Sequence, residues 1–192
     1  MTITEDSLGL DFSKECFEKA IFDQYNIQDC SFTDCTFTEC SFRGAVFDSA
    51  KFSYCSISIC DFQNAVFRNC SFTECRISGS YFMDSRLRSS SFERCVFQYT
   101  VFDKADFSSS SFEFSSFMQC SFEGLRSKKT SFIECNLGST SFRNTMLSNI
   151  SFKGSDISGI YLSDTFKELK GASLDVSQAL DVAKILGVKI IS

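Results

Sequence analysis

The chain contains no proline, no histidine and no tryptophan among its 192 residues. The lack of histidine excludes the Ser-His and Cys-His pairs that many hydrolases use. The lack of proline leaves every backbone N–H free to join a hydrogen-bonded ladder, as sheet-rich chains require. No apolar run reaches the ~20 residues of a membrane-spanning helix, and the acidic N-terminus does not resemble a signal peptide. We therefore expect a cytoplasmic protein without membrane contact, and no catalytic residue, cofactor or metal.

A strict period of five is the main feature that the sequence does have. Stepping by five from Phe12 to Leu162 visits thirty-one positions, which hold twenty-two Phe, four Ile, four Leu and, as the only break, Ser127. A helix would repeat its apolar residues every three or four positions, and a half-buried strand every second. A period of five matches neither element, so it indicates an internal structural repeat.

A second series, of small residues, lies two positions before each large one. Ten of the eleven Cys belong to it, and only Cys16 lies outside. Because Ala, Ser and Thr replace Cys freely in this series, the thiols are typical of small core fillers. No histidine is present to complete a common zinc site. We therefore interpret the thiols as buried, reduced and structural.

Sorting the large residues by twenty shows a second period. Every twentieth residue from Phe12 to Phe152 is Phe, whereas two of the neighbouring series mix Phe, Ile and Leu. A period of twenty within a period of five predicts a coil with four sides, and thirty-one pentads predict about eight coils. With ~4.8 Å between stacked strands, such a rod is roughly 37 Å long.

The segment SFTDCTFTECSFRGA and its repeats resemble the pentapeptide-repeat family, whose fold is a right-handed quadrilateral β-helix. The resemblance covers about residues 10–165. It implies an all-β solenoid over residues 12–163, preceded by an N-terminal lead-in over 1–11 and followed by a C-terminal segment over 164–192.

Ser127 predicts a local irregularity, because a hydroxyl occupies a position that is otherwise always apolar. In one interpretation the wall bulges here and Ser127 turns outward. In the other, Ser127 is buried and bonded to a neighbouring carbonyl while the coil continues undisturbed.

Charge is distributed unevenly along the chain. Residues 1–50 hold ten acidic and three basic side chains, whereas residues 126–192 hold six and nine. Scattered acids usually form a solubilising surface, but an acidic rod also suits a basic, DNA-binding groove. The candidate partner-binding residues at the acidic end are Asp23, Asp29, Asp34, Glu39 and Asp48.

The period stops after Leu162, and a different pattern follows. Asp175 or Ser177 can cap a helix, which Gly187 is placed to end. Residues 188–191 then predict a short strand. Because the open end of a stacked rod must be covered, this helix and strand can cap the coil, pair with a second copy, or do both. The candidate dimerisation residues are Ala179, Leu180, Ala183, Leu186, Val188 and Ile190.

The helix followed by Leu-Gly-Val-Lys-Ile-Ile is similar to the C-terminal ends of the topoisomerase-protecting branch of the family, the Qnr, MfpA and McbG type. Members of that branch resemble DNA in size and charge, bind DNA gyrase and dimerise through this helix and strand. The resemblance implies a homodimeric DNA mimic that binds DNA gyrase or topoisomerase IV, modulates it with quinolone or toxin resistance as the outcome, and does not itself bind nucleic acid.

Two features depart from that branch. The unbroken period leaves no room for the projecting loops that many Qnr proteins carry. In addition, Arg126, Lys128 and Lys129 do not suit a uniformly negative DNA mimic. The alternative is therefore a generic β-helical scaffold with another protein partner.

Overall fold

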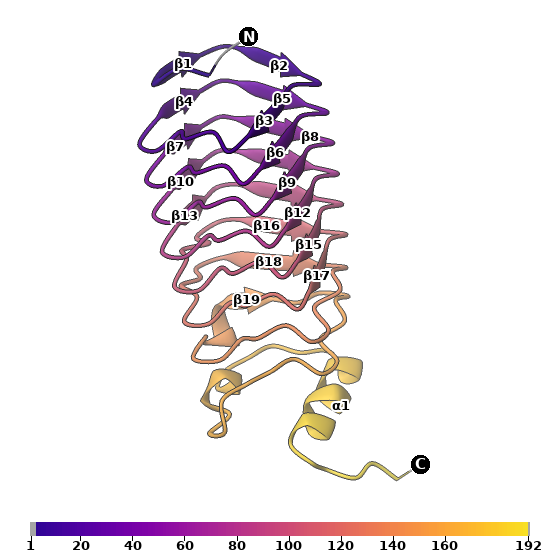
Figure 1. Ribbon diagram of the computed structural model, residues 1–192. Helices are drawn as coiled ribbons and strands as arrows, with labels where there is room; N and C mark the ends of the chain where they lie inside the picture. The colour runs from indigo at the N-terminus through magenta and orange to yellow at the C-terminus, as the bar shows by residue number, and fades with distance from the viewer. Residues whose placement is uncertain (1–2, 192) are drawn as a thin grey trace.

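The period of five winds the chain into a parallel β-solenoid of about seven turns in the computed structural model, which describes residues 3–191 (Figure 1). Each turn takes twenty residues, because Asp6 pairs in register with Asn26 and Ser31 pairs in register with Lys51. In the strands of three residues the middle side chain points inward and its two neighbours point outward. The four-sided coil predicted from the sequence is therefore confirmed.

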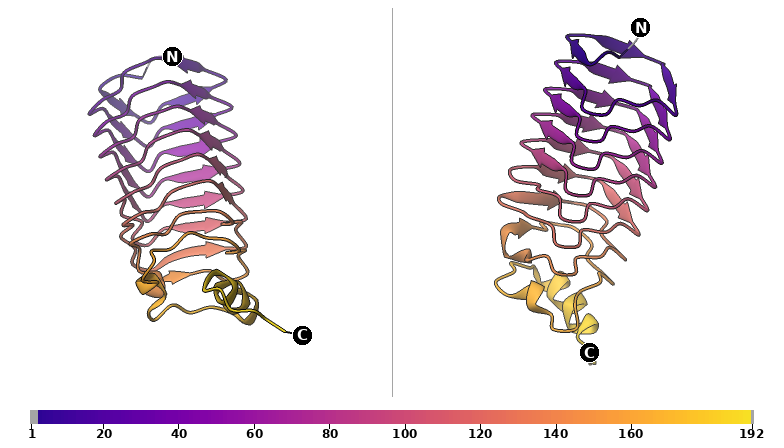
Figure 2. Two further views of the ribbon diagram at one scale, coloured as in Figure 1. Left: turned by 60° about the horizontal axis from the view of Figure 1, so that its bottom comes forward. Right: turned by 60° about the vertical axis from the view of Figure 1, so that its left-hand side comes forward.

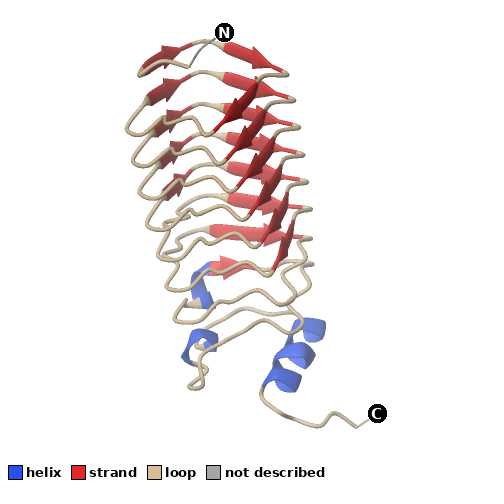
Figure 3. Cartoon of the chain, in the orientation of Figure 1, coloured by secondary structure: helices blue, strands red, loops and turns tan. Residues whose placement is uncertain are grey.

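Three sides of the rod are parallel sheets, which we call faces 1, 2 and 3 in chain order (Figure 3). Face 4 completes each turn and is linked from coil to coil by isolated bridges such as Ile21–Ser41 and Ser41–Asp61. Face 1 comprises β1 (Asp6–Leu8), β4 (Asn26–Gln28), β7 (Val46–Asp48), β10 (Val66–Arg68) and β13 (Arg86–Arg88). Face 2 comprises β2 (Asp11–Ser13), β5 (Ser31–Thr33), β8 (Lys51–Ser53), β11 (Ser71–Thr73), β14 (Ser91–Glu93), β16 (Ser111–Glu113), β18 (Thr130–Ile133) and β19 (Ile150–Ser151). Face 3 comprises β3 (Cys16–Glu18), β6 (Thr36–Thr38), β9 (Ser56–Ser58), β12 (Arg76–Ser78), β15 (Val96–Gln98) and β17 (Ser116–Met118).

The core consists of phenylalanine rings stacked along each side of the rod. Phe42 and Phe62 lie 4.8 Å apart between ring centroids with planes 2° apart, and Phe47 and Phe67 lie 4.7 Å apart at 1°. Rings on adjacent sides meet edge to face, as Phe32 and Phe37 do at 5.6 Å. Aromatic pairs favour both offset-stacked and edge-to-face geometries. Faces 2 and 4 each hold an unbroken column of phenylalanine rings, whereas Ile and Leu interrupt the columns of faces 1 and 3. Large apolar side chains stacked in four columns are therefore the physical basis of the period of five.

The corners between the sides use a backbone conformation that residue type alone does not reveal. As far as Gly159, the residue two after an inward side chain has a positive φ at every corner except Asn149, which lies in a 3₁₀ turn. Many kinds of residue hold this position, including the β-branched Ile59 at φ 54°. Such a conformation costs an L-residue roughly 1–2 kcal/mol. A hydrogen bond between coils offsets the cost, as when the N–H of Ile59 donates to the carbonyl of Ser78 at 2.9 Å. Glycine is thus optional at the corners.

The solenoid begins earlier than the sequence suggests, because β1 lies within the expected lead-in over residues 1–11 and pairs with β4. Ser7 occupies the inward position of β1, so the apolar period hides this coil. The Ser7 hydroxyl accepts a hydrogen bond from the N–H of Thr4 at 3.0 Å and donates to the Thr4 carbonyl at 3.2 Å. Ile3 is buried and covers this end of the core.

The wall does not bulge at Ser127. The neighbouring Arg126 keeps its bridge to Asp106, and the N–H of Phe107 donates to the Arg126 carbonyl at 2.9 Å. Ser127 itself is half-buried between the positions of Phe107 and Leu147 in the adjacent coils. The interpretation with an undisturbed coil is therefore correct for the backbone, although the Ser127 side chain is not fully enclosed.

The C-terminal segment closes the open end of the rod (Figure 2). It contains two 3₁₀ turns, η1 (Leu147–Asn149) in the last coils and η2 (Lys167–Leu169) beyond them, and the helix α1 (Val176–Ile185). Asp175 caps α1, and its carboxylate and the Gln178 side chain bond reciprocally to backbone N–H groups. The predicted helix and its cap are confirmed.

The strand expected over residues 188–191 is not formed, and these residues follow α1 without regular secondary structure (Figure 1). Gly187 ends the helix with a φ of 78°. The prediction of a strand was wrong for this single chain, because the solenoid presents no ladder edge to these residues. The edge is occupied by two polar side chains of the cap instead.

Gln178 and Glu168 satisfy backbone groups that the last coils leave open. The buried Gln178 donates Nε2 to the carbonyls of Phe152 at 2.6 Å and Ser155 at 2.9 Å. The fully buried Glu168 accepts from the N–H of Asn144 at 2.7 Å. Buried polar groups without such partners are costly, so these two side chains terminate the solenoid where a further coil would otherwise stack.

Candidate protein-interaction surfaces

The five acidic residues predicted to bind a partner do not form one patch. Asp29, Asp34 and Glu39 are exposed at three successive corners of a single coil, so they point in different directions. Asp48 lies on face 1 and Asp23 on face 4. The structure therefore arranges the predicted residues around the rod and brings no more than two of them to the same side.

Asp23 has a structural role. Its carboxylate accepts hydrogen bonds from the Ser41 hydroxyl and from the N–H of Arg43, the latter at 2.9 Å. Asp103 holds Ser121 and the N–H of Glu123 in the same way, four coils further on. Replacing Asp23 would break these bonds between coils, so Asp23 contributes to the wall itself in addition to being a candidate contact residue.

A longer row of acids runs along the border between faces 2 and 3. We call this row the acidic edge; it consists of Asp34, Glu74, Glu93, Glu113 and Glu134. Glu93 and Glu113 are in-register neighbours of adjacent strands, an arrangement in which like charges destabilise a sheet. Arg94 relieves part of this repulsion through an ion pair with Glu93. From coil to coil at ~4.8 Å, the edge extends over roughly 24 Å.

The sequence contains a signal for this edge that does not appear when charges are counted by segments of the chain. Sorting the outward positions by twenty, as was done for the large residues, places Asp34, Glu74 and Glu134 in one column and Glu93 and Glu113 in the column beside it. The charge separation is thus across the rod as well as along it. Face 1, which borders face 2, carries basic residues on three of its coils: Arg68 on one, Arg86 and Arg88 on the next, and Arg126 and Lys128 on a third.

The candidate dimerisation residues divide between a buried and an exposed side of the C-terminal segment. α1 packs against the end of the core through Val182 and Gln178, with Ile185 half-buried. Leu180 and Leu186 remain 44% and 46% exposed, and Ala179 lies on the same outer side while Ala183 is half-buried. Val188 and Ile190 are exposed beyond the helix. The cap therefore uses one face of α1 and leaves an apolar face open.

The cysteine thiols are buried in the wall of the solenoid. The thiol of Cys55 donates to the carbonyl of Phe32 at 3.3 Å, and that of Cys95 donates to the carbonyl of Phe72 at 3.4 Å. Burial raises the pKa of both Cys70 and Cys120 to about 12. Since the thiolate is the reactive form, the thiols of Cys70 and Cys120 are unreactive near neutral pH. Cys16, the one cysteine outside the small-residue series, is also the exposed one.

A shallow hollow lies where faces 3 and 4 meet in the last coils. Small side chains, including Gly138, Ser139 and Ser158, leave room there between Met118 and Tyr161. Its lining residues include no carboxylate, amine or guanidinium.

Among the described residues, no helix has the length and apolar character needed to cross a membrane.

Two family models match this repeating wall. The model described as "Pentapeptide repeat region" matches residues 45–116, and "Pentapeptide repeats (8 copies)" matches residues 26–63 and 129–165. The chain belongs to the pentapeptide-repeat family. The ranges matched include strands of all three sheets, so the family assignment covers the whole architecture of this pentapeptide-repeat rod.

Several solved structures align with this chain over most of its length. A trypsin-treated variant of QnrB1, a plasmid-mediated fluoroquinolone resistance protein, is 18% identical with a TM-score of 0.47, over 96% of this chain and 99% of that one. A protein of the Arabidopsis thaliana thylakoid lumen is 17% identical with a TM-score of 0.31, over 92% and 77%. HetL of Nostoc sp. strain PCC 7120, involved in heterocyst differentiation regulation, is 9% identical with a TM-score of 0.20, over 82% and 91%. No curated protein sequence matches the chain significantly.

Proposed function

We propose that this pentapeptide-repeat rod is a DNA mimic that binds the DNA-binding groove of DNA gyrase or topoisomerase IV and modulates the enzyme. The observation that carries the proposal is the acidic edge. It keeps Glu93 and Glu113 as in-register neighbours despite their repulsion, at a spacing set by a rigid ladder. A surface that sacrifices stability in this way is well suited to a basic partner.

The geometry of the edge supports electrostatic mimicry. From Glu74 to Glu134 the edge holds one carboxylate per coil, at intervals of ~4.8 Å, while Tyr54 occupies the coil between Asp34 and Glu74. This charge spacing is similar in scale to that of a duplex, which carries one phosphate per ~3.4 Å along each strand. The stacked core holds the row straight. The partner would therefore meet a preorganised line of negative charge, which lowers the entropic cost of binding.

An assay of supercoiling by purified gyrase, with and without a quinolone, tests this proposal. We expect wild type to alter supercoiling, and the triple variant Glu74→Lys, Glu113→Lys, Glu134→Lys to need at least about a hundredfold more protein, because like charges would then face the groove. Lysine already occupies corner positions such as Lys14 and Lys129, so the fold should tolerate these changes.

A second triple variant, Asp29→Lys, Glu39→Lys, Asp48→Lys, makes the same change of charge in the N-terminal coils and leaves the acidic edge intact. If only this variant loses its effect, the binding site is the acidic coil expected from the sequence and not the acidic edge. Full activity of both variants would contradict electrostatic mimicry, and no effect of wild type on either topoisomerase would contradict the function itself. Quinolone resistance in cells expressing the protein is the corresponding physiological readout.

We further propose that two copies associate through the outer side of α1 and the segment that follows it. This contact would cover Leu180, Leu186, Val188 and Ile190, which are exposed in the single chain. Two rods joined at their C-terminal ends by a two-fold axis would form an isologous dimer. The ladder that residues 188–191 lack in one chain could then be supplied by the other.

The dimer predicts a clear change of oligomeric state. We expect Leu180→Asp with Leu186→Asp to be monomeric in sedimentation at micromolar concentration, because carboxylates would otherwise be buried at the contact. The control Val176→Asp with Ser177→Asp adds the same charge at the start of α1, where Val176 is 80% exposed, and should remain dimeric. A monomeric wild type at this concentration would refute the proposal.

A generic protein-interaction scaffold is a second candidate. Its support is the exposed apolar side chains at the corners, where Ile59 and Tyr99 are 59% and 62% exposed in spite of their positive φ. Backbone strain at exposed apolar residues is a motive for suspecting a contact surface. If the variant Ile59→Asn, Tyr99→Asn still bound the partner of wild type, these corner residues would not be the contact surface. If wild type also had no effect on gyrase, the acidic edge would have no support as a contact surface either.

A further inference from the structure

We propose that face 1 of the C-terminal half is a binding surface for the phosphate backbone of double-stranded DNA. Outward positions of this face and of the two corners that border it carry a cluster of basic residues, which we call the basic face. Its members are Arg68, Arg86, Arg88, Lys104, Arg126, Lys128 and Lys129. All seven side chains belong to exposed residues.

The ladder stacks these charges on one another. Arg68 and Arg88 are in-register neighbours of β10 and β13, so two guanidinium groups repel each other at strand spacing. Arg126 and Lys128 lie together two coils beyond Arg88 on the same face, and the coil between carries Asp106 and Ser108. From Arg68 to Lys128 the cluster extends over three strand spacings, or roughly 14 Å. As on the acidic edge, like charges are held together at a cost to stability.

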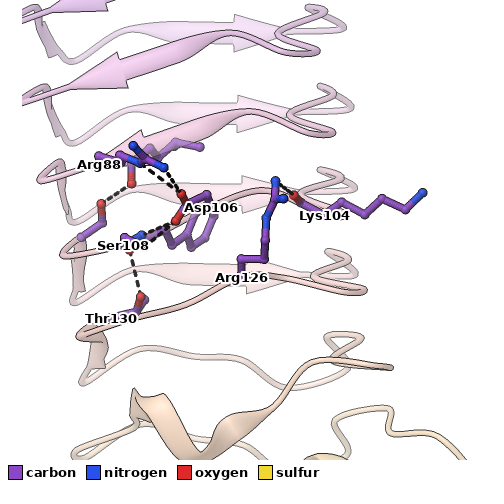
Figure 4. A network of polar contacts seen from close by, with 9 residues as sticks. Arg88, Lys104, Asp106, Ser108, Arg126 and Thr130 are labelled. Atoms are coloured by element: carbon purple, nitrogen blue, oxygen red, sulfur yellow. Dashed lines mark hydrogen bonds and ion pairs between the residues drawn. The ribbon is translucent and has the colours of Figure 1, made fainter.

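Two of the guanidinium groups are held in place (Figure 4). Arg88 donates Nε at 3.0 Å and Nη2 at 2.7 Å to the Oδ2 atom of Asp106. Arg126 donates Nη2 to the carbonyl of Lys104 at 3.0 Å. Ordering these side chains before a ligand arrives reduces the entropy lost on binding. Among the salt bridges that the structure describes, Arg88–Asp106 is the one that uses a member of the basic face.

Fewer acids than bases lie on or beside this face: Asp106, Asp48, which is the in-register neighbour of Arg68, and Asp84. Burial raises the pKa of Asp106, but hydrogen bonds from Ser108 and Arg88 outweigh it and keep the pKa below its usual value. On the adjoining face 4, the carboxylate of Asp103 accepts from the N–H of Glu123, and Glu123 accepts from the Asn144 amide. The half-exposed Asp84 lies at the corner shared by faces 4 and 1. The local charge is therefore clearly positive although the whole chain has a net charge of −5.

The choice of duplex DNA follows from side-chain type and shape. Four of the seven residues are Arg, whose planar guanidinium suits phosphate oxygens. Tyr54, Tyr81, Tyr99 and Phe114, the exposed aromatic rings of the middle coils, lie away from face 1, so stacking on unpaired bases, as single strands require, is not available there. A flat row of cations without base-reading groups fits sequence-independent contact with a duplex backbone. The sequence-based expectation of no direct nucleic-acid binding came from the resemblance to DNA mimics. This proposal departs from that expectation because of the basic face.

Fluorescence anisotropy with a short, mixed-sequence DNA duplex tests the proposal. With about six phosphate contacts, log K against log salt should have a slope of about −5, and affinity should fall by about a thousandfold between about 50 and 200 mM salt. Arg68→Glu, Arg86→Glu, Lys128→Glu should reduce the magnitude of this slope by about 3. The control Arg76→Glu, Arg143→Glu, Lys153→Glu makes the same change of charge at exposed positions on other faces and should keep the wild-type slope.

Circular dichroism and thermal unfolding of both variants establish that the solenoid is intact, since none of the six replaced side chains is used in a hydrogen bond described above. Equal loss of binding by the two variants would overturn the proposal, because net charge and not the basic face would then be responsible. Binding of a poly-glutamate peptide without binding of the duplex would overturn it in favour of an acidic protein partner. The proposal would also be overturned if wild type bound neither the duplex nor the poly-glutamate peptide at low salt.

Discussion

Replacing Phe72 by Ala should destabilise the protein by about 3–5 kcal/mol, the usual cost of truncating a buried phenylalanine. The Phe72 ring lies 4.6 Å from those of both Phe52 and Phe92, with planes 4° and 8° apart. Its loss would interrupt the aromatic column of face 2 and leave a cavity that a ladder fixed at strand spacing cannot close. Equilibrium unfolding in urea, with the far-ultraviolet circular dichroism of the sheet as the signal, gives the free energy directly.

Phe114→Ala is the matched control. Phe114 is 46% exposed at a corner, where the Arg94 guanidinium carbon lies 5.4 Å from its ring centroid. We expect its removal to change stability by no more than about 0.5 kcal/mol, as for most surface substitutions. A loss under about 1 kcal/mol for Phe72→Ala would mean that stacked rings are not the principal source of stability.

Glu168→Ala should produce the second large loss, about 2–4 kcal/mol, because it removes a fully buried side chain and leaves two partly buried donors without their acceptor. The Glu168 carboxylate accepts from the N–H of Asn144 at 2.7 Å and from the Ser163 hydroxyl at 2.9 Å. The nearby, exposed Asp164 serves as the control, and Asp164→Ala should be almost neutral. Equal stability of the two variants would show that the cap does not depend on this carboxylate.

The same residue predicts a dependence on pH. Burial raises the pKa of Glu168, but hydrogen bonds from its own backbone, Ser163 and Asn144 outweigh it and hold the pKa below its usual value. The unfolded chain therefore binds the proton more tightly, and the stabilisation is complete above the ordinary Glu pKa of about 4.3 and lost as the pH falls through the lower folded value. Wild type should lose more stability than Glu168→Gln over this acidic range. Parallel stability curves would contradict the assignment.

The core was predictable from sequence because nearly every inward position of the period holds a large apolar side chain, with Ser7 and Ser127 as the exceptions. The period therefore placed Phe72 and its neighbours correctly, and Ser7 escaped notice only because it satisfies its hydroxyl locally. The corner conformation was not predictable, since the hydrogen bond between coils stabilises a positive φ for residues as different as Ile59 and Lys104.

The surfaces were predictable in part. The outer face of α1 follows from helical spacing, but the absence of a strand after Gly187 depends on whether a ladder edge is available, which the local sequence does not encode. The acidic and basic sides emerge only when outward residues are assigned to columns of the coil. In a count of charge by segments of the chain, Glu93 and Arg68 cancel, although they lie on different sides of the rod.

Competition between this protein and duplex DNA for gyrase tests the central claim most directly. The measurement should use the variant Arg68→Glu, Arg86→Glu, Lys128→Glu, so that DNA cannot bridge the two proteins through the basic face. If the acidic edge occupies the DNA-binding groove, saturating duplex should weaken the binding of this variant to gyrase by at least about a hundredfold. An affinity for gyrase that is unchanged by saturating duplex would contradict the claim that the rod takes the place of DNA.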